Sequence, residues 1–263
     1  MMINMKTDYP LPHVGHDLTG RVALVTGATS GLGRRFARAL AAAGAAVGVA
    51  GRREDRIAEV VAEIDAAGGR AVGVPLDVLD ADALVAAVDG VEQAFGLVTI
   101  LVNNAGIPDA QRAHKIDVEL VDRLLGTNVR APWLLATEVA RRLIAAGEPG
   151  HIVNLSSIGS FHYDGKGAAL YSTSKAAINR MTETLAVEWA RYRINVNAIA
   201  PGAFSSEMMD GMIERIGDPS EHFPRKRLGD PAQLDSTLLF LVSPASEFVT
   251  GTVVRVDDGQ TPR

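Results

Sequence analysis

Short apolar runs alternate with longer segments of helical periodicity along most of the chain, and this alternation constrains the fold more than any other feature. Apolar runs of about five residues have the length of buried strands, whereas the amphipathic segments between them have the length of helices. The runs that we expect to be strands cover residues 22–25, 46–50, 71–75, 98–102, 151–155, 194–199 and 252–256. Such an order predicts a parallel sheet with helices in the connections.

The segments of helical period complete this pattern. They cover residues 31–43, 54–67, 80–95, 117–146 (as one or two helices), 168–192 and 231–242. Several stop at a glycine, which is a common residue just beyond a helix end. We therefore predict an α/β fold: a Rossmann-like, doubly wound, parallel seven-stranded sheet with helices on both faces.

Composition excludes several classes of protein. The chain has 263 residues, 47% of them hydrophobic, a net charge of −5 and no cysteine. The acid excess argues against a nucleic-acid or anionic-membrane surface, and the lack of cysteine excludes disulfides and thiolate metal sites. The histidines are scattered without a pattern that would bind zinc, so we expect no metal.

The chain reads as one domain preceded by an arm. Residues 1–19 contain charges and prolines but no apolar core of signal-peptide length, and no segment reaches a membrane-spanning run. We expect an N-terminal arm at residues 1–19, one domain at residues 20–263 and a cytoplasmic location.

One stretch near the end is rich in glycine and proline. Residues 204–228 hold several of each around a short helical pattern, and a long loop in a compact domain is usually functional. We predict that this stretch is a substrate lid. Met208, Met209 and Met212 give its helix an apolar edge that faces either substrate or the body of the protein.

A glycine-rich turn follows the first expected strand and leads into the first expected helix. Glycines let the backbone approach a pyrophosphate, and the free N–H groups at a helix N-terminus attract it. An ordinary strand-to-helix turn is the alternative, but strand, turn and helix stand in the order that a dinucleotide site requires. The turn reads Thr26-Gly27-Ala28-Thr29-Ser30-Gly31-Leu32-Gly33.

The second expected strand ends without the carboxylate that would accept a hydrogen bond from the ribose of NAD. Arg52 and Arg53 follow it instead. Guanidinium groups suit a 2'-phosphate, so this pair favours NADP(H), with NAD(H) as the alternative if both are ordinary surface arginines. After the third strand, Asp77 either accepts from the adenine amino group or starts the next turn, and Val78 adjoins it.

Tyr171 and Lys175 stand four residues apart in the helix expected at 168–192. Residues at this spacing share a helix face, and a nearby ammonium favours the phenolate form of a tyrosine. This places a general acid/base pair on the helix. The plain alternative is a half-buried ring beside a solvated charge.

Three motifs in the expected order resemble the short-chain dehydrogenase/reductase family. They are the glycine turn at residues 26–33, the run Asn103-Asn104-Ala105-Gly106 after the fourth strand, and Tyr171 with Lys175. The resemblance extends over residues 18–259. It implies that Asn104, Ala105 and Gly106 contact the cofactor.

The resemblance also implies roles for residues that the pattern alone would not single out. Ser157 matches the serine that binds the substrate oxygen, with Ser156 as its competitor because the loop 159–167 is one residue longer than usual. Asn128 matches the asparagine that helps to hold a proton-relay water near Lys175. Residues around the nicotinamide correspond to Pro201, Gly202 and Ser206.

These matches predict an NADP(H)-dependent oxidoreductase that interconverts a secondary alcohol and a ketone. A 3-oxoacyl-thioester reductase is one alternative, and a non-catalytic NADP(H)-binding regulator is another. Basic residues that could serve an acidic carrier are Arg130, Lys166, Arg225, Lys226 and Arg227. The resemblance further implies a homotetramer or dimer formed through the helices at 117–146 and 168–192. Asp258, in Val256-Asp257-Asp258-Gly259, departs from the family pattern and has no explanation in the sequence.

Overall fold

The protein is built on a seven-stranded sheet in which every pairing is parallel. The computed structural model describes residues 13–109, 111–163, 165 and 167–262. The strands are β1 (Val22–Thr26), β2 (Ala46–Gly51), β3 (Arg70–Pro75), β4 (Ile100–Asn103), β5 (Gly150–Leu155), β6 (Ile194–Pro201) and β7 (Val253–Val256). Their order is β3-β2-β1-β4-β5-β6-β7. The order reverses between β1 and β4, where a doubly wound sheet opens a crevice for ligands.

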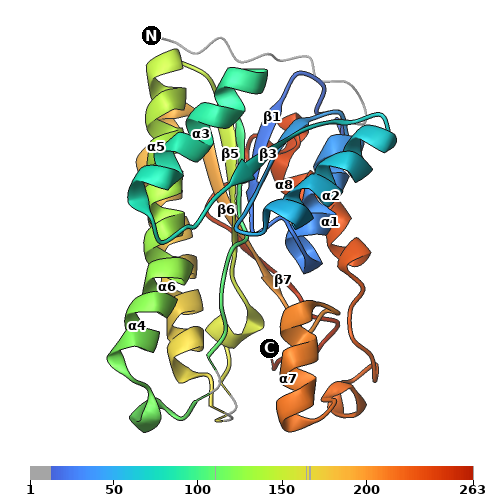
Figure 1. The fold of residues 1–263 in the computed structure, drawn as a ribbon, viewed down its shortest axis with the longest axis vertical. Helices are drawn as coiled ribbons and strands as arrows, with labels where there is room; N and C mark the ends of the chain where they lie inside the picture. The colour runs from blue at the N-terminus through green and yellow to red at the C-terminus, as the bar shows by residue number, and fades with distance from the viewer. Residues whose placement is uncertain (1–12, 110, 164, 166, 263) are drawn as a thin grey trace.

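Helices cover both faces of this sheet (Figure 1). They are α1 (Gly31–Ala42), α2 (Glu54–Ala66), α3 (Ala81–Phe95), α4 (Val118–Leu125), α5 (Ala131–Ala146), α6 (Ala169–Trp189), α7 (Glu207–Ile216) and α8 (Asp235–Val242). One core cluster joins the sheet to α3, α5 and α6, and a second joins it to α1, α2 and α8. The predicted fold class is confirmed.

Burial explains why the central strands read as continuous apolar runs. Every residue of β1, β2, β4, β5 and β6 is buried. The strands at the two edges, β3 and β7, keep exposed or half-buried positions. This is the pattern of a parallel sheet covered on both faces.

Two predicted helical segments contain breaks, and the segment at 117–146, expected as one or two helices, forms two. The segment expected at 117–146 forms α4, a wider π turn at η2 (Gly126–Arg130), and then α5. The segment expected at 231–242 begins as the 3₁₀ turn η6 (Pro231–Leu234), where Asp230 caps the first turn, and continues as α8. The other short helical turns are η1 (Ala113–Lys115), η3 (Ile158–Ser160), η4 (Ala190–Tyr192), η5 (Ser220–His222) and η7 (Pro244–Ser246).

Packing begins before the domain boundary expected at residue 20. The Leu18 side chain is fully buried, and its N–H donates to Ala43 O at 2.7 Å. Residues 1–12 of the expected arm lie outside the described residues, as does Lys166.

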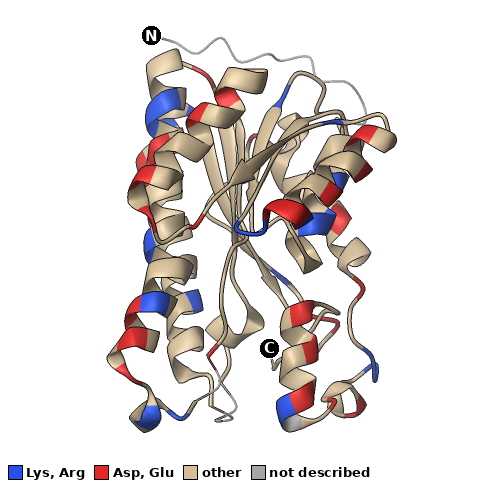
Figure 2. Cartoon of the chain, viewed as in Figure 1, with Lys and Arg blue, Asp and Glu red and all other residues tan. Residues whose placement is uncertain are grey.

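Charged residues of both signs are distributed over the outer helices (Figure 2). Helix α7 differs because its acidic residues outnumber its basic residue: it carries Glu207, Asp210 and Glu214 but only Arg215. Among the helices that the structure describes, none is long and apolar enough to cross a membrane.

Candidate active site

A cavity of about 1010 Å³ opens at the carboxyl edge of the sheet. Its walls come from the segments that follow β1 to β6, because parallel strands place all of their carboxyl ends at one edge. Three of the four predicted catalytic residues line it: Ser157, Tyr171 and Lys175. The predicted cofactor residues that also line it are Gly27, Thr29, Ser30, Gly31, Leu32, Gly33, Arg52, Arg53, Asp77, Val78, Asn104, Ala105, Gly106, Pro201, Gly202 and Ser206.

The glycine turn is packed so closely that side chains would not fit. A Cβ on Gly33 would lie 2.2 Å from Gly27 O, and one on Gly27 would lie 2.9 Å from Ala105 Cα. Gly27 also has φ +62, which favours glycine. Asn104 fixes the turn, since its Nδ2 donates to Thr26 O at 2.9 Å and to Gly27 O at 3.1 Å. The backbone of the turn therefore forms the wall of the cavity.

The N-terminus of α1 fits an anionic group. Helix α1 starts at Gly31, its N-cap Ser30 makes no side-chain cap, and no acidic residue lies in its first turn. The first N–H groups of a helix lack partners within it and carry partial positive charge. The turn and the helix start are thus suited to hold the pyrophosphate of a dinucleotide.

Arg52 and Arg53 lie at the end of β2, where the cavity would hold the ribose of a dinucleotide. The Arg53 guanidinium donates to Thr29 Oγ1 at 3.3 Å and pairs with Glu207 of α7 at 3.2 Å. Both arginine side chains are exposed. They are available to a phosphate, although Arg53 would then share its donors with Glu207.

The two serines after β5 differ in how their hydroxyls are used. Ser156 is buried, and its hydroxyl bonds Asn179, Ser160 and the Lys175 carbonyl. The Ser157 hydroxyl accepts from Gly159 N at 3.1 Å, and its interaction with the Tyr171 phenol lowers the pKa of that phenol. Ser157 thus faces the tyrosine, whereas Ser156 is tied into the packing.

Tyr171 and Lys175 lie together on the cavity side of α6. Lys175 is 5% exposed, its Nζ donates to Leu155 O at 2.7 Å, and it lies 5.6 Å from the centre of the Tyr171 ring. Burial lowers the pKa of the Lys175 ammonium to about 8.

From the sequence, the Lys175 ammonium was expected to lower the pKa of the Tyr171 phenol. This prediction is wrong. Burial raises the pKa of the Tyr171 phenol, the hydrogen bond with Ser157 opposes this, and the Asp109 carboxylate raises the pKa further. Burial penalises the phenolate more than its surroundings favour it. The spacing of Tyr171 and Lys175 reveals the lysine on the same helix, but neither the burial of the phenol nor the Asp109 carboxylate beside it.

Asn128 lies in the π turn η2 and is buried rather than part of the cavity wall. Its Oδ1 accepts from Ile107 N, and its Nδ2 donates to Ile107 O and to Ser174 Oγ. Its amide therefore holds the loop after β4 against α6. Gly106 lies between Asn128 and Lys175: a Cβ there would be 3.3 Å from Asn128 Oδ1 and 3.5 Å from Lys175 Nζ.

Comparison with known proteins identifies the family. The model of the short chain dehydrogenases matches residues 21–216. The chain belongs to the short-chain dehydrogenase/reductase family. It is 36% identical to gluconate 5-dehydrogenase of Gluconobacter oxydans, with 93% of this chain and 96% of that relative covered. It is 37% identical to galactitol 2-dehydrogenase (L-tagatose-forming) of Cereibacter sphaeroides, with 93% and 96% covered.

A solved member of the family agrees in fold. Gluconate 5-dehydrogenase from Burkholderia cenocepacia, in complex with NADP and tartrate, superimposes with a TM-score of 0.88 at 32% identity, covering 95% of this chain and 98% of that one. The family prediction is confirmed. This short-chain dehydrogenase is an oxidoreductase that interconverts a secondary alcohol and a ketone. The prediction of a nicotinamide cofactor is confirmed too, and NADP is the form bound in the solved relative.

Two predicted cofactor residues of this dehydrogenase also have local structural tasks. Asp77 Oδ1 accepts from Leu79 N at 3.0 Å, as expected of a residue that starts a turn. Ser206 is the N-cap of α7, and its hydroxyl accepts from Met209 N at 3.2 Å. Neither contact removes the residue from the cavity wall.

Asp109 was missed by the sequence analysis. It belongs to the loop after β4, is buried at 5% exposure, and lines the cavity. Its Oδ2 accepts from the Tyr171 N–H at 3.0 Å. The signal that could have found it is indirect: α6 starts after Ala168, which has no side-chain oxygen to cap the helix, so an acceptor has to come from elsewhere.

Asp258 also gains an explanation from the structure. It adopts φ 51, and its carboxylate pairs with Arg227 at 2.8 Å and with Arg225 at 3.2 Å. It therefore ties the segment after β7 to the end of the predicted lid.

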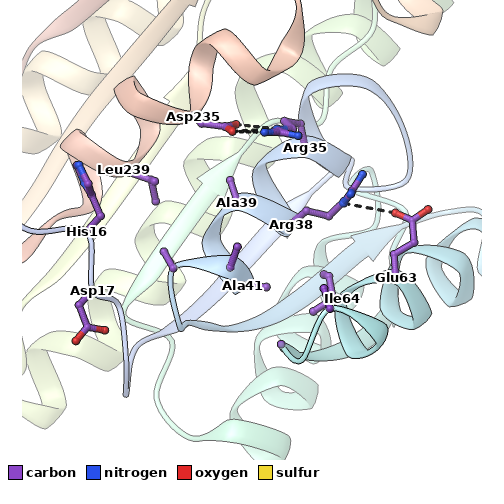
Figure 3. A pocket seen from close by; sticks show the side chains of 14 residues that line it. His16, Asp17, Arg35, Arg38, Ala39, Ala41, Glu63, Ile64, Asp235 and Leu239 are labelled. Atoms are coloured by element: carbon purple, nitrogen blue, oxygen red, sulfur yellow. Dashed lines mark hydrogen bonds and ion pairs between the residues drawn. The ribbon is translucent and has the colours of Figure 1, made fainter.

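A second hollow, of about 630 Å³, lies between α1, α2 and α8 (Figure 3). Arg35 pairs with Asp235 across it, and Arg38 reaches Glu63 at 3.7 Å. Its arginines are thus already neutralised by carboxylates, and we assign it no ligand.

Proposed function

We propose that this dehydrogenase acts with NADP(H) on a secondary hydroxyl or the corresponding ketone of a small polyhydroxylated molecule. The observation that carries the proposal is that Ser157, Tyr171 and the buried Lys175 line the same cavity as the glycine turn. Support for the substrate class comes from the relatives named for gluconate and galactitol.

The roles that we assign follow from the contacts. The cofactor supplies or accepts the hydride. The Ser157 hydroxyl orients the substrate oxygen, and the Tyr171 phenol donates a proton to that oxygen in reduction and removes it in oxidation. Lys175 supplies positive charge beside the phenol and a ligand for the nicotinamide ribose. Asn128 acts by holding Ile107 and Ser174, next to Lys175.

We assign the dinucleotide to the residues that line the cavity from Gly27 to Ser206. The glycine turn and the start of α1 would hold the pyrophosphate. Arg52 and Arg53 would hold the 2'-phosphate of NADP(H), and the lack of a carboxylate at the end of β2 disfavours NAD(H).

A 3-oxoacyl-thioester reductase is the second candidate. The basic residues that could bind an acidic carrier are partly engaged within the protein, because Arg225 and Arg227 pair with Asp258 and Arg130 donates to Leu79 O. These contacts disfavour the carrier without touching the catalytic chemistry. A non-catalytic regulator is disfavoured because Ser157, Tyr171 and Lys175 are all present together.

The test is a substrate panel with the purified protein. Oxidation of NADPH and reduction of NADP⁺ are followed with polyols, sugar acids, their keto forms and acetoacetyl thioesters. We expect turnover with at least one polyhydroxylated compound. Faster turnover of the thioester would support the second candidate, and tight NADPH binding without turnover of any compound would support the regulator.

We also propose that residues 204–228 cover the substrate and that the protein is a homotetramer or dimer. Apolar side chains on α4 and α5 are exposed, including Val118 at 70% and Trp133 at 45%, as expected of a face that meets another copy. Light scattering of the protein and of Trp133→Glu measures this: we expect a smaller species for the variant. The cytoplasmic location and the boundary at residue 20 stay predictions of the sequence.

A further inference from the structure

The first residue of α7 reaches the end of β2, where the ribose of a dinucleotide is expected. The Glu207 carboxylate pairs with the Arg53 guanidinium at 3.2 Å, and the same guanidinium nitrogen donates to Thr29 Oγ1 at 3.3 Å. Thr29 packs on the end of β2, since a Cβ on Gly51 would lie 2.6 Å from Thr29 Cγ2. The Arg53 contact therefore brings a carboxylate of α7 to the end of this strand.

The start of α7 also lies against the glycine turn. A Cβ on Gly31 would be 3.2 Å from Ser206 Cβ, so the residue before Glu207 meets the start of α1 across the cavity. The Ser206 hydroxyl caps α7 by accepting from Met209 N at 3.2 Å. These contacts hold Glu207 at the dinucleotide half of the cavity in addition to its ion pair with Arg53.

Glu207 differs from the other acidic residues of the cavity wall. Of the described residues that line the cavity, three are acidic: Asp77, Asp109 and Glu207. Asp109 is buried and caps α6, and Asp77 accepts from Leu79 N in the turn after β3. The Glu207 side chain is 58% exposed, and the arginine paired with it is 45% exposed. This pair is therefore open to a ligand.

We propose that Glu207 is a specificity-determining residue for the cofactor, which supplies from α7 the carboxylate that β2 lacks and so narrows the preference for NADP(H) over NAD(H). The inference rests on the proposed function and adds NAD(H) as a second cofactor of the same site. The ribose 2'-hydroxyl of NAD(H) can donate to the Glu207 carboxylate. The dianionic 2'-phosphate of NADP(H) has no donor, competes with Glu207 for Arg53 and is repelled by its charge.

The test measures the binding of NADPH and NADH to the parent and to Glu207→Gln without substrate. The amide keeps the size of the side chain and removes its charge. Titrations followed by nicotinamide fluorescence give the two Kd values. Because the ion pair is exposed, we expect modest effects: NADPH binds about 5-fold more tightly to the variant and NADH about 2-fold more weakly, so the ratio of Kd for NADH to Kd for NADPH rises about 10-fold.

Two further variants separate the charge at this position from the structure of α7. Asp210→Asn makes the same chemical change in the first turn of α7 but outside the cavity wall, and is expected to leave the ratio unchanged. Arg53→Gln removes the guanidinium that Glu207 and the 2'-phosphate share, so we expect the ratio to fall. A ratio that Glu207→Gln lowers, or raises by less than about twofold, would overturn the inference.

A pair of fragments locates the effect at the ribose. Adenosine 2',5'-bisphosphate and AMP carry the adenosine end of the two dinucleotides without the nicotinamide, and their Kd ratio is measured by calorimetry in the same proteins. We expect Glu207→Gln to change this ratio in the same direction as for the dinucleotides. A change seen with the dinucleotides but not with the fragments would overturn the inference, because the effect would then arise in the substrate half of the cavity.

Failure of the proposed function gives a different result. The titrations contain no alcohol or ketone, so they test the inference even if no polyhydroxylated compound is turned over. A parent that binds NADH more tightly than NADPH would contradict the NADP(H) preference of the proposed function, whereas the inference depends on the change that Glu207→Gln makes. Absence of binding of both dinucleotides would overturn both.

Discussion

The two halves of the cavity are built differently. The half that suits a dinucleotide consists of backbone and short side chains at the ends of buried strands, such as Gly27, Gly33 and Asn104. The other half is formed by the loop after Ser157 and by α7, where Tyr163 and Met208 are 44% and 43% exposed. The sheet thus fixes the chemistry that all members of a family share, while peripheral segments are free to determine which molecule is selected.

We expect the largest effect from removing the Tyr171 hydroxyl, which lies at the boundary between the two halves of the cavity. Tyr171→Phe removes the proposed proton donor, and we expect turnover to fall by about 10²- to 10⁴-fold while cofactor binding is largely kept. Steady-state kinetics and NADPH titration measure the two quantities. Tyr192→Phe, a tyrosine outside the cavity wall, is the control. Equal turnover in Tyr171→Phe would contradict the assignment.

The second prediction concerns the cost of the buried lysine. Because the pKa of Lys175 is lowered from 10.5 to about 8, the unfolded chain binds more protons than the folded one between these pH values. The free energy of unfolding should therefore rise with pH across this window. Below pH 8 we expect Lys175→Met to be more stable than the parent by about 3 kcal/mol, although inactive.

Denaturant unfolding without cofactor measures this difference as a function of pH. The gap between parent and variant should close as pH rises through the window, since the buried amine is then neutral in both states. Lys115→Met, at an exposed position of η1, should show no such gap. If the parent were more stable than Lys175→Met at pH 7, the prediction would be wrong, and other interactions of the ammonium would offset the free energy that its burial costs.

The smallest expected effect concerns the choice between NADPH and NADH in the dinucleotide half of the cavity. Arg52→Asp places a carboxylate at the end of β2, and we expect the ratio of kcat/KM with NADPH to that with NADH to fall by about 10- to 100-fold. Arg56→Asp, in the first turn of α2 and outside the cavity wall, is the matched control. An unchanged ratio in Arg52→Asp would remove Arg52 from the proposed 2'-phosphate site.

The features that the sequence predicted well are local or tied to strand ends. The sheet follows from apolar runs, and the glycine turn follows from the order of strand, turn and helix. Both depend on neighbours in the chain, so their signal survives without knowledge of the tertiary structure. The breaks within 117–146 and 231–242 were less predictable, because helical periodicity continues through a π or 3₁₀ turn.

Asp109 and Asp258 show why the rest could not be predicted. The cap that Asp109 gives to α6 joins residues 62 positions apart, and no pattern within either segment encodes it. The upward shift of the Tyr171 pKa comes first from burial of the phenol, and the charge of the Asp109 carboxylate adds to it. Asp258 pairs with Arg225 and Arg227, two residues whose charges looked free in the sequence.

The contact between Arg53 and Glu207 links the two halves of the cavity, since it joins the end of β2 to the first residue of α7. A phosphate that binds Arg53 competes with Glu207 for the same guanidinium. We therefore expect the position of α7 to respond to binding of the dinucleotide. In kinetic terms, we expect the two ligands to add in a fixed sequence, with the dinucleotide first and the alcohol or ketone second.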